Sequence, residues 1–192
     1  SIILANATIN GEERKVIMAT TKGDYAYILD ATNGELLHEP ISFGAQKINV
    51  YNSNKGNDAD FLLSQEVIVD QTYCPGAFGG SSTTSAFADN ILFVASQNYC
   101  TKFTKGQVIY KDQLIDGYQI ETTQAAQSSS VHAIDVSTGQ IKWTFPIESR
   151  YQGGITVSSG VVYLLDISGN FYALDSETGE MLKKIPMNGA GN

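Results

Sequence analysis

The last part of the chain alternates short apolar runs with turn signals. Residues 153–185 read GGITVSSGVVYLLDISGNFYALDSETGEMLKKI. Runs of β-branched and aromatic residues of this length are typical of strands. The Ser-Gly, Gly-Asn and Thr-Gly steps are typical of tight turns, because Gly and Asn tolerate the positive φ that such turns need. We expect four strands, at 155–158, 161–165, 171–174 and 181–185. Four antiparallel strands closed within about 33 residues correspond to one blade of a β-propeller.

The same alternation predicts strands upstream of this blade. The two clearest apolar pairs lie in the first and middle parts of the chain, at 15–19 and 25–29, and at 85–88 and 91–95. The second pair reads as a hairpin over Asp89-Asn90. Further strands are expected at 66–69, 130–135 and 141–145.

A blade implies repeats, and one motif recurs. Its full form, Ala-x-Asp-x-x-Thr-Gly with Trp four residues after the Gly, is carried by Ala133, Asp135, Thr138, Gly139 and Trp143. A second copy has Lys183 in the Trp position and consists of Ala173, Asp175, Thr178 and Gly179. A looser copy has His38 there and consists of Ile28, Asp30, Asn33 and Gly34. The 40 residues from Asp135 to Asp175 equal one blade, whereas the 105 residues from Asp30 to Asp135 must hold another blade or a large insertion.

The recurring residues have a structural explanation. An Asp side chain can accept hydrogen bonds from backbone N–H groups of the turn that follows it, and Gly takes a conformation that other residues resist. A Trp in the last strand of a blade can pack flat against the neighbouring blade. We therefore interpret Asp30, Asp135, Asp175 and Trp143 as packing residues and not as catalytic ones.

These patterns predict an all-β chain that forms part of a single β-propeller domain over residues 1–192, with three to four four-stranded antiparallel blades. The expected blade pieces are 1–43, 64–100, 128–152 and 153–187, with polar insertions at 44–63 and 101–127. The chain opens on Ser1 without Met, and an open arc would expose raw sheet faces. We expect the remainder of the propeller, from the same or another chain, to be a partner.

Charge narrows the class of partner. The formal net charge is −8 and the isoelectric point is near 4.6, which argues against nucleic acid and anionic membrane surfaces. No apolar run approaches the ~20 residues of a membrane span. The sequence lacks a Gly-x-Ser-x-Gly elbow and a phosphate-binding Gly-x-x-x-x-Gly-Lys loop, so hydrolase and nucleotide-binding readings have little support.

The two cysteines, Cys74 and Cys100, suggest a compartment. Metal ligation would require further ligands at short spacing, and the two His residues, His38 and His132, lie far away in sequence. A disulfide is favoured, with two buried thiols as the alternative. Such a bridge would contribute roughly 3–4 kcal/mol in the chain-entropy model and indicates an extracytoplasmic location: periplasmic, secreted or at the cell surface.

The motifs resemble those of a known family. The Ala-x-Asp-x-x-Thr-Gly-x-x-x-Trp unit is similar to the tryptophan-docking motif of the PQQ-dependent (quinoprotein) alcohol dehydrogenases, which are eight-bladed propellers. Three further segments, 14–35, 74–100 and 153–179, are similar to family segments that follow in the same order in the C-terminal half of the propeller. The resemblance implies the fold and PQQ and calcium as cofactors.

The resemblance also implies which residues contact the cofactor. Lys22 lies eight residues before Asp30, as the family's cofactor-contacting Lys lies before its Leu-Asp. A cation there suits chemistry in which negative charge develops on quinone oxygens; from spacing alone, Lys22 would be a solvated turn residue. The loop Gly79, Gly80, Ser81, Ser82 lies where the family places Gly-Gly, an amide and a Trp, so Ser81 and Ser82 depart from the pattern.

Two functions follow from this resemblance. The first is a quinoprotein dehydrogenase that oxidises a small-molecule alcohol or sugar, with the catalytic Asp and the calcium ligands upstream of Ser1 and no metal ligand in this chain. The alternative is a non-catalytic propeller that acts as an extracytoplasmic binding or assembly scaffold. The two Trp positions held by His38 and Lys183, together with Ser81 and Ser82, favour the alternative.

Overall fold

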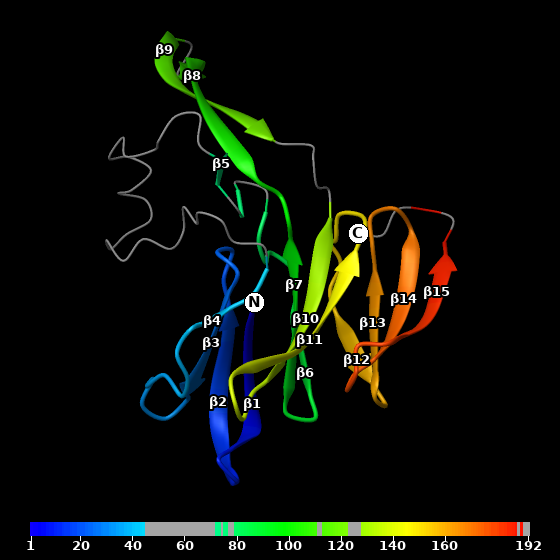
Figure 1. Cartoon of the computed structure of the whole chain (residues 1–192). Helices are drawn as coiled ribbons and strands as arrows, with labels where there is room; N and C mark the ends of the chain where they lie inside the picture. The colour runs from blue at the N-terminus through cyan, green and yellow to red at the C-terminus, as the bar shows by residue number, and fades with distance from the viewer. Residues whose placement is uncertain are drawn as a thin grey trace.

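In the computed structural model, the described residues are 1–44, 72–73, 75–76, 79–110, 113–122, 128–187 and 189. Strands are the regular elements of these residues, and no helix occurs among them. They form three four-stranded sheets and one three-stranded sheet, and every strand pair is antiparallel. Figure 1 shows the three four-stranded sheets side by side. The predicted all-β propeller class is confirmed.

The first and third sheets follow chain order. The first consists of β1 (Ile2–Ile9), β2 (Glu12–Thr20), β3 (Tyr25–Asp30) and β4 (Ile41–Ser42). The third consists of β12 (Thr156–Ser158), β13 (Val161–Leu165), β14 (Asn170–Asp175) and β15 (Met181–Pro186), each within one residue of its predicted bounds. Ser159 and Gly160 turn between β12 and β13 with φ of 50° and 75°.

The second sheet contains an insertion. Its strands are β6 (Ala86–Ala88), β7 (Ile91–Gln97), β10 (Ser129–Asp135) and β11 (Gln140–Ile147). Between β7 and β10 the chain forms a hairpin of β8 (Thr101–Tyr110) and β9 (Gln113–Thr122), which β5 (Thr72–Tyr73) joins. The interval between Asp30 and Asp135 therefore holds an insertion within a blade. The strand predicted at 66–69 and the polar insertion 44–63 lie, except for Gly44, outside the described residues.

Two apolar clusters hold the sheets together, one on each face of the second sheet. Leu92 and Val94 of β7 pack toward the first sheet, whereas Phe93 of the same strand packs toward the third. Successive side chains of a strand point to opposite faces, so a strand in the middle blade is buried on both faces. All seven residues of β7 are buried for this reason.

Two aromatic rings, Trp143 of β11 and His38 of the segment between β3 and β4, also dock one blade on the next. The Trp143 indole Nε1 donates to the carbonyl oxygen of Ser176 at 3.0 Å, and its ring lies against Gly179. His38 repeats this contact one blade earlier, because its Nε2 lies 2.9 Å from the carbonyl oxygen of Val136 and its ring lies against Gly139. His38 thus fills the Trp position in geometry as well as in sequence.

The Asp of each repeat shapes the turn that receives the ring. The Oδ1 atom of Asp135 accepts from the backbone N–H of Ser137 at 2.8 Å, and that of Asp175 accepts from Thr178 at 2.8 Å. Asp30 makes the same contact with Thr32 at 2.8 Å. The predicted structural role of the three Asp residues is confirmed.

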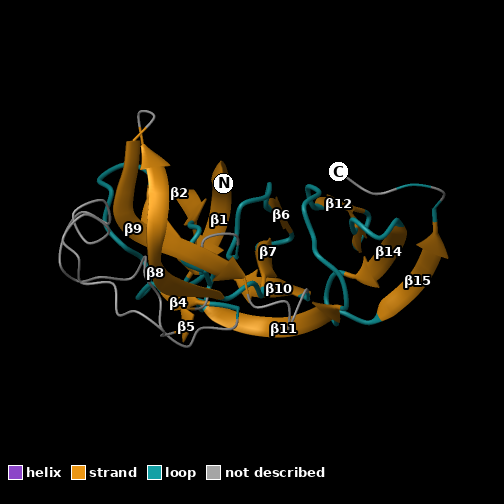
Figure 2. Ribbon diagram, turned by 90° about the horizontal axis from the view of Figure 1, so that it is seen from above, coloured by secondary structure: helices purple, strands orange, loops and turns teal. Residues whose placement is uncertain are grey.

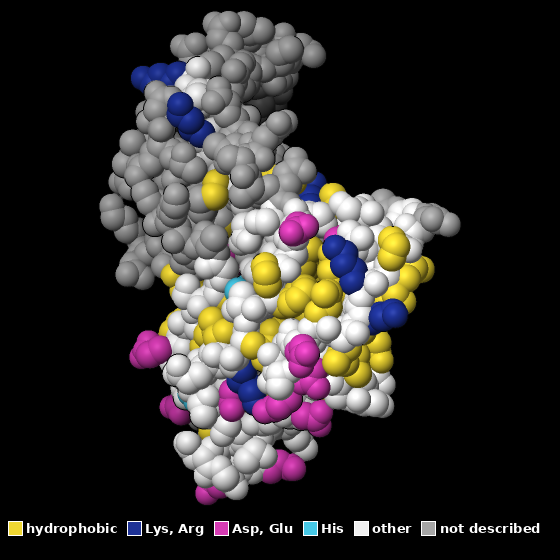
Figure 3. Space-filling view, turned by 45° about the vertical axis from the view of Figure 1, so that its right-hand side comes forward, with side chains coloured by type: hydrophobic (Ala, Val, Ile, Leu, Met, Phe, Trp, Pro, Cys, Tyr) yellow, Lys and Arg dark blue, Asp and Glu magenta, His cyan; other side chains and the backbone are white. Residues whose placement is uncertain are grey.

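The ends of the row of sheets carry unmatched docking features. Gly34, the equivalent of Gly139, has φ of +77° and no ring against it within the described part of the chain. At the other end, β15 is exposed along its whole length, and Met181, Leu182 and Ile185 are 39–52% exposed. Figure 3 shows apolar side chains exposed on this side of the molecule. Figure 2 shows β15 at the border of the row, opposite the first sheet.

Candidate functional site

The sequence-predicted site residues meet at one end of the sheets. This end carries the β2–β3 turn, the loop before β6, the end of β7 and the loop between β11 and β12, and the β8–β9 hairpin rises from it (Figure 1). The Asp-containing docking turns lie at the opposite end. The structure therefore separates the packing motif from the candidate site.

Lys22 lies in the β2–β3 turn and reaches the loop before β6. Its Nζ donates to the carbonyl oxygen of Gly79 at 2.8 Å. Gly80 has φ of +80°, and a Cβ atom there would collide with the carbonyl oxygen of Lys22, so only glycine fits. Burial lowers the pKa of Lys22, the charge of Asp24 opposes that shift, and the charge of Arg150 adds to it.

Asp24 closes the same turn and is buried, with 1% of its surface exposed. It has φ of 60°, a left-handed conformation that Asp tolerates better than most residues. Its Oδ2 accepts from the Ser96 hydroxyl at 2.7 Å, and the backbone N–H of Ser81 donates to the carboxyl group. Burial raises the pKa of Asp24 to about 7, against the opposing effect of these hydrogen bonds and of Lys22.

Gln97, at the end of β7, links the loop of Gly80 to Arg150. The backbones of Gly80 and Gln97 exchange hydrogen bonds at 2.9 and 3.3 Å, and the Gln97 side-chain Nε2 donates to Ser82 Oγ at 3.2 Å. Its Oε1 accepts from Arg150 Nε at 3.0 Å. The guanidinium lies over the ring of Tyr99, 5.4 Å from its centroid, a geometry that favours the cation.

All five predicted cofactor-contacting residues are thus neighbours or linked through one partner. Lys22 contacts Gly79 and Gly80, Ser81 binds Asp24, and Ser82 binds Gln97. Their role in binding a cofactor remains a prediction. Sequence reasoning missed Asp24, Ser96, Gln97 and Arg150. The available sequence signal for Asp24 was its place in the tight turn after Lys22, because Gly is the usual residue at a left-handed turn position.

Two further features of this end bear on its chemistry. Ser81 Oγ is buried and has no hydrogen-bond partner among the described residues. The described residues contain no cluster of three or more His, Cys, Asp or Glu side chains that could hold a metal ion. Cys74 lies outside the described residues, so the bridge to Cys100 stays a prediction.

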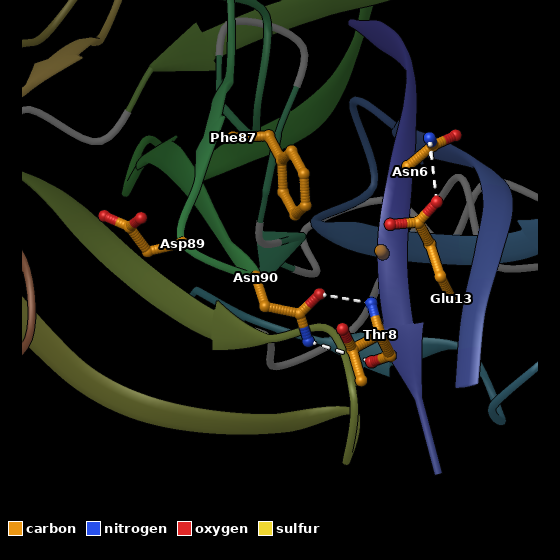
Figure 4. A pocket seen from close by; sticks show the side chains of 7 residues that line it. Asn6, Thr8, Glu13, Phe87, Asp89 and Asn90 are labelled. Atoms are coloured by element: carbon orange, nitrogen blue, oxygen red, sulfur yellow. Dashed lines mark hydrogen bonds between the residues drawn. The ribbon is translucent and has the colours of Figure 1, made fainter. Parts of the chain in front are cut away.

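A hollow of about 330 Å³ lies at the opposite end, between β1 and the β6–β7 turn (Figure 4). Its polar groups already bind one another. Asn90 accepts from the Thr8 N–H at 2.8 Å and donates to the Thr8 carbonyl at 3.0 Å, and Asn6 donates to Glu13 at 3.3 Å. We therefore assign the hollow to the contact between the first two blades.

Asn90→Ala is expected to lower the free energy of unfolding by about 1–2 kcal/mol, because it removes two hydrogen bonds and places Ala at a φ of 63°. Chemical denaturation measures the change. Asn90→Gly is the matched control, since it removes the bonds and keeps the φ, and it should cost less. Unchanged stability in both variants would show that the two hydrogen bonds between Asn90 and Thr8 do not stabilise the fold.

The raised pKa of Asp24 predicts a pH dependence of stability. Between about 4 and about 7 the unfolded Asp24 is ionised and the folded one is protonated, so unfolding releases a proton and stability falls as pH rises. His132 opposes this trend, because burial lowers its pKa to about 4. Asp24→Asn isolates the Asp24 contribution: we expect its stability relative to the unsubstituted protein to rise by at most about 4 kcal/mol across this range. Parallel stability curves would contradict the assignment.

Comparison with known proteins agrees with this fold. Residues 127–191 match a repeat family described as outer membrane protein assembly factor BamB. The putative dehydrogenase XoxF of Paracoccus denitrificans is 25% identical over 96% of the chain and 34% of its own length. The lanthanide-dependent methanol dehydrogenase of Methylorubrum extorquens is 24% identical over the same shares. The chain thus spans about a third of the length of these relatives.

Solved structures give the same result. A europium-containing methanol dehydrogenase superposes with a TM-score of 0.74 at 16% identity, over 99% of this chain and 35% of its own. A quinohemoprotein alcohol dehydrogenase from Comamonas testosteroni gives 0.74 at 20%, over 98% and 31%. The docked four-stranded sheets define a propeller segment. The superpositions show the propeller fold, and the sequence of this segment is similar to about a third of the dehydrogenases named above.

The described residues form no helix long and apolar enough to cross a bilayer.

Proposed function

We propose that the protein is a quinoprotein dehydrogenase that oxidises an alcohol or sugar, and that the Lys22 end of this chain contacts its PQQ. The observation that carries the proposal is the meeting of Lys22 with the loop of residues 79–82, two segments that the family resemblance assigned to the cofactor independently. Nothing in the local sequence requires them to meet, because 57 residues separate Lys22 from Gly79.

The residues present fit an anionic quinone. Lys22 is a partly desolvated cation, so its charge acts more strongly on a bound anion than it would in water. Ser81 Oγ is a buried polar atom that no other described residue of the chain binds. When bound, PQQ supplies the capacity to accept the electrons of the substrate. Lys22 would hold a cation beside the oxygens on which negative charge develops.

Calcium and the catalytic base would come from outside this chain. The family resemblance places the calcium ligands and the catalytic Asp upstream of Ser1, and we propose no metal ligand or catalytic residue among residues 1–192. We also propose an extracytoplasmic location, periplasmic, secreted or at the cell surface, which the predicted bridge between Cys74 and Cys100 supports.

The unmatched docking features, Gly34 at one end and the exposed strand β15 at the other, support the remainder of the propeller as a partner. His38 and Trp143 each place a ring on the turn of the next blade, and the same relation would bring Lys183 to a turn of a following blade and a ring of a preceding blade to Gly34. The exposed apolar residues of β15 would be covered in the same assembly.

One observation favours the second candidate, a binding or assembly scaffold without cofactor. The family model that matches residues 127–191 is described as an outer membrane protein assembly factor. The scaffold reading predicts that Lys22→Ala leaves partner binding intact. A strong loss of partner binding on that single change would count against it.

Titration of the full-length protein with PQQ and calcium, in the presence of an artificial electron acceptor, tests the dehydrogenase proposal. Saturable binding and dye reduction on addition of alcohols or sugars are expected. Absence of both would reject the proposal and leave the scaffold as the remaining candidate.

A further inference from the structure

Two cations, Lys22 and Arg150, converge at the candidate site. Lys22 lies between β2 and β3 and Arg150 between β11 and β12, and a chain of hydrogen bonds joins them: Lys22 Nζ donates to the Gly79 carbonyl, Gly80 pairs with the Gln97 backbone, and Gln97 Oε1 accepts from Arg150 Nε. The Arg150 charge also lowers the pKa of Lys22. Within the described part of the chain, neither cation forms an ion pair with a carboxylate. Like charges held together repel, so their proximity costs free energy that a bound anion would recover.

Arg150 is held in place by groups that leave its charge intact. Gln97 accepts from its Nε at 3.0 Å, and Tyr99 lies beneath it. The Gln152 amide lies beside the same guanidinium and accepts from it when its oxygen and nitrogen are exchanged. An amide oxygen and an aromatic ring orient a guanidinium without neutralising it. The planar group still has N–H donors for the paired oxygens of a carboxylate.

Asp24 is the acid whose charge acts on Lys22, and other groups bind its carboxyl. Ser96 and the Ser81 N–H bind it within the protein, and Gly44 closes over it, since a Cβ at residue 44 would lie 2.5 Å from Asp24 Oδ2. Its raised pKa of about 7 also keeps part of the Asp24 population uncharged near neutral pH. The Asp24 charge therefore acts on Lys22 only in the ionised fraction of Asp24.

We infer that Lys22 and Arg150 together form a receptor for a ligand with at least two negative charges, in which Arg150 is a specificity residue for a carboxylate of the ligand. This inference rests on the proposed function in one respect: the proposed function names PQQ, a quinone with three carboxylates, as the ligand. The two-cation site itself does not depend on quinone chemistry.

The test is equilibrium binding to the full-length protein, measured by calorimetry with two probes, PQQ and citrate. Arg150→Gln removes the charge, and Arg150→Lys keeps it while losing the planar fork. Lys142→Gln is the matched control, because Lys142 is a cation at the opposite end that pairs with Glu177. Thermal unfolding of each variant reports any structural effect.

We expect Arg150→Gln to weaken PQQ binding at least tenfold, Arg150→Lys to restore part of it, and Lys142→Gln to change it less than twofold. Raising the salt concentration should weaken binding to the unsubstituted protein more than to Arg150→Gln. If PQQ binds and both Arg150 variants behave like Lys142→Gln, the proposed role of Arg150 in a two-cation receptor is rejected, and the dehydrogenase proposal stands. If PQQ does not bind but citrate does, with the same dependence on Arg150, the receptor stands and the dehydrogenase proposal fails. If neither probe binds, both are rejected.

Discussion

Replacing Lys22 by alanine is expected to weaken PQQ binding by about 10- to 100-fold. A hydrogen bond between a charged donor and a partly buried partner contributes about 1.5–3 kcal/mol, and each 1.4 kcal/mol corresponds to a factor of ten. Lys22 is the cation that the fold brings to the loop of residues 79–82. Equilibrium titration of the full-length protein with PQQ measures the effect.

Lys15→Ala is the control for this variant, because Lys15 is an exposed cation near the start of β2, the strand that leads to the Lys22 turn. It should leave PQQ binding unchanged. Lys22→Arg keeps a cation and should retain more affinity than Lys22→Ala. Equal affinity of Lys22→Ala and the unsubstituted protein would remove Lys22 from the cofactor site.

Trp143→Ala should destabilise the fold by about 3 kcal/mol. The variant removes a large half-buried ring between two blades and its hydrogen bond to the Ser176 carbonyl. Trp143→Phe keeps an aromatic ring and loses the hydrogen bond, so it should cost only about 1 kcal/mol. Chemical denaturation of the full-length protein gives both values. An alanine variant no less stable than the phenylalanine variant would refute the docking role.

The repeat could be predicted from the sequence because its determinants are local. The turn at Ser159-Gly160 and the runs on either side of it specify their strands without help from distant residues, and the predicted bounds of the third sheet agree with the structure. The position of Trp143 could also be predicted locally, because it lies four residues after Gly139 of the same motif. For His38, however, the sequence suggested a degenerate position, whereas the structure shows a ring docked like Trp143.

The site could be predicted only in part because its contacts are not local. Asp24 and Ser96 are 72 residues apart, and Arg150 and Gln97 are 53 apart. No periodicity encodes which loops meet at one end of adjacent blades. Lys22 and residues 79–82 were found through a family resemblance, and Arg150, which has no counterpart in that resemblance, was missed. The β8–β9 hairpin was missed as well, because its sequence is polar and lacks clear alternation.

The central claim is that this propeller holds a quinone at its Lys22 end. The most direct measurement is the absorbance spectrum of the intact protein from its native source, combined with mass spectrometry of the small molecules it releases. A quinone band near the visible edge and the mass of PQQ are predicted, and both should be reduced in Lys22→Ala. A spectrum of protein alone, with no uptake of added PQQ and calcium, would contradict the claim.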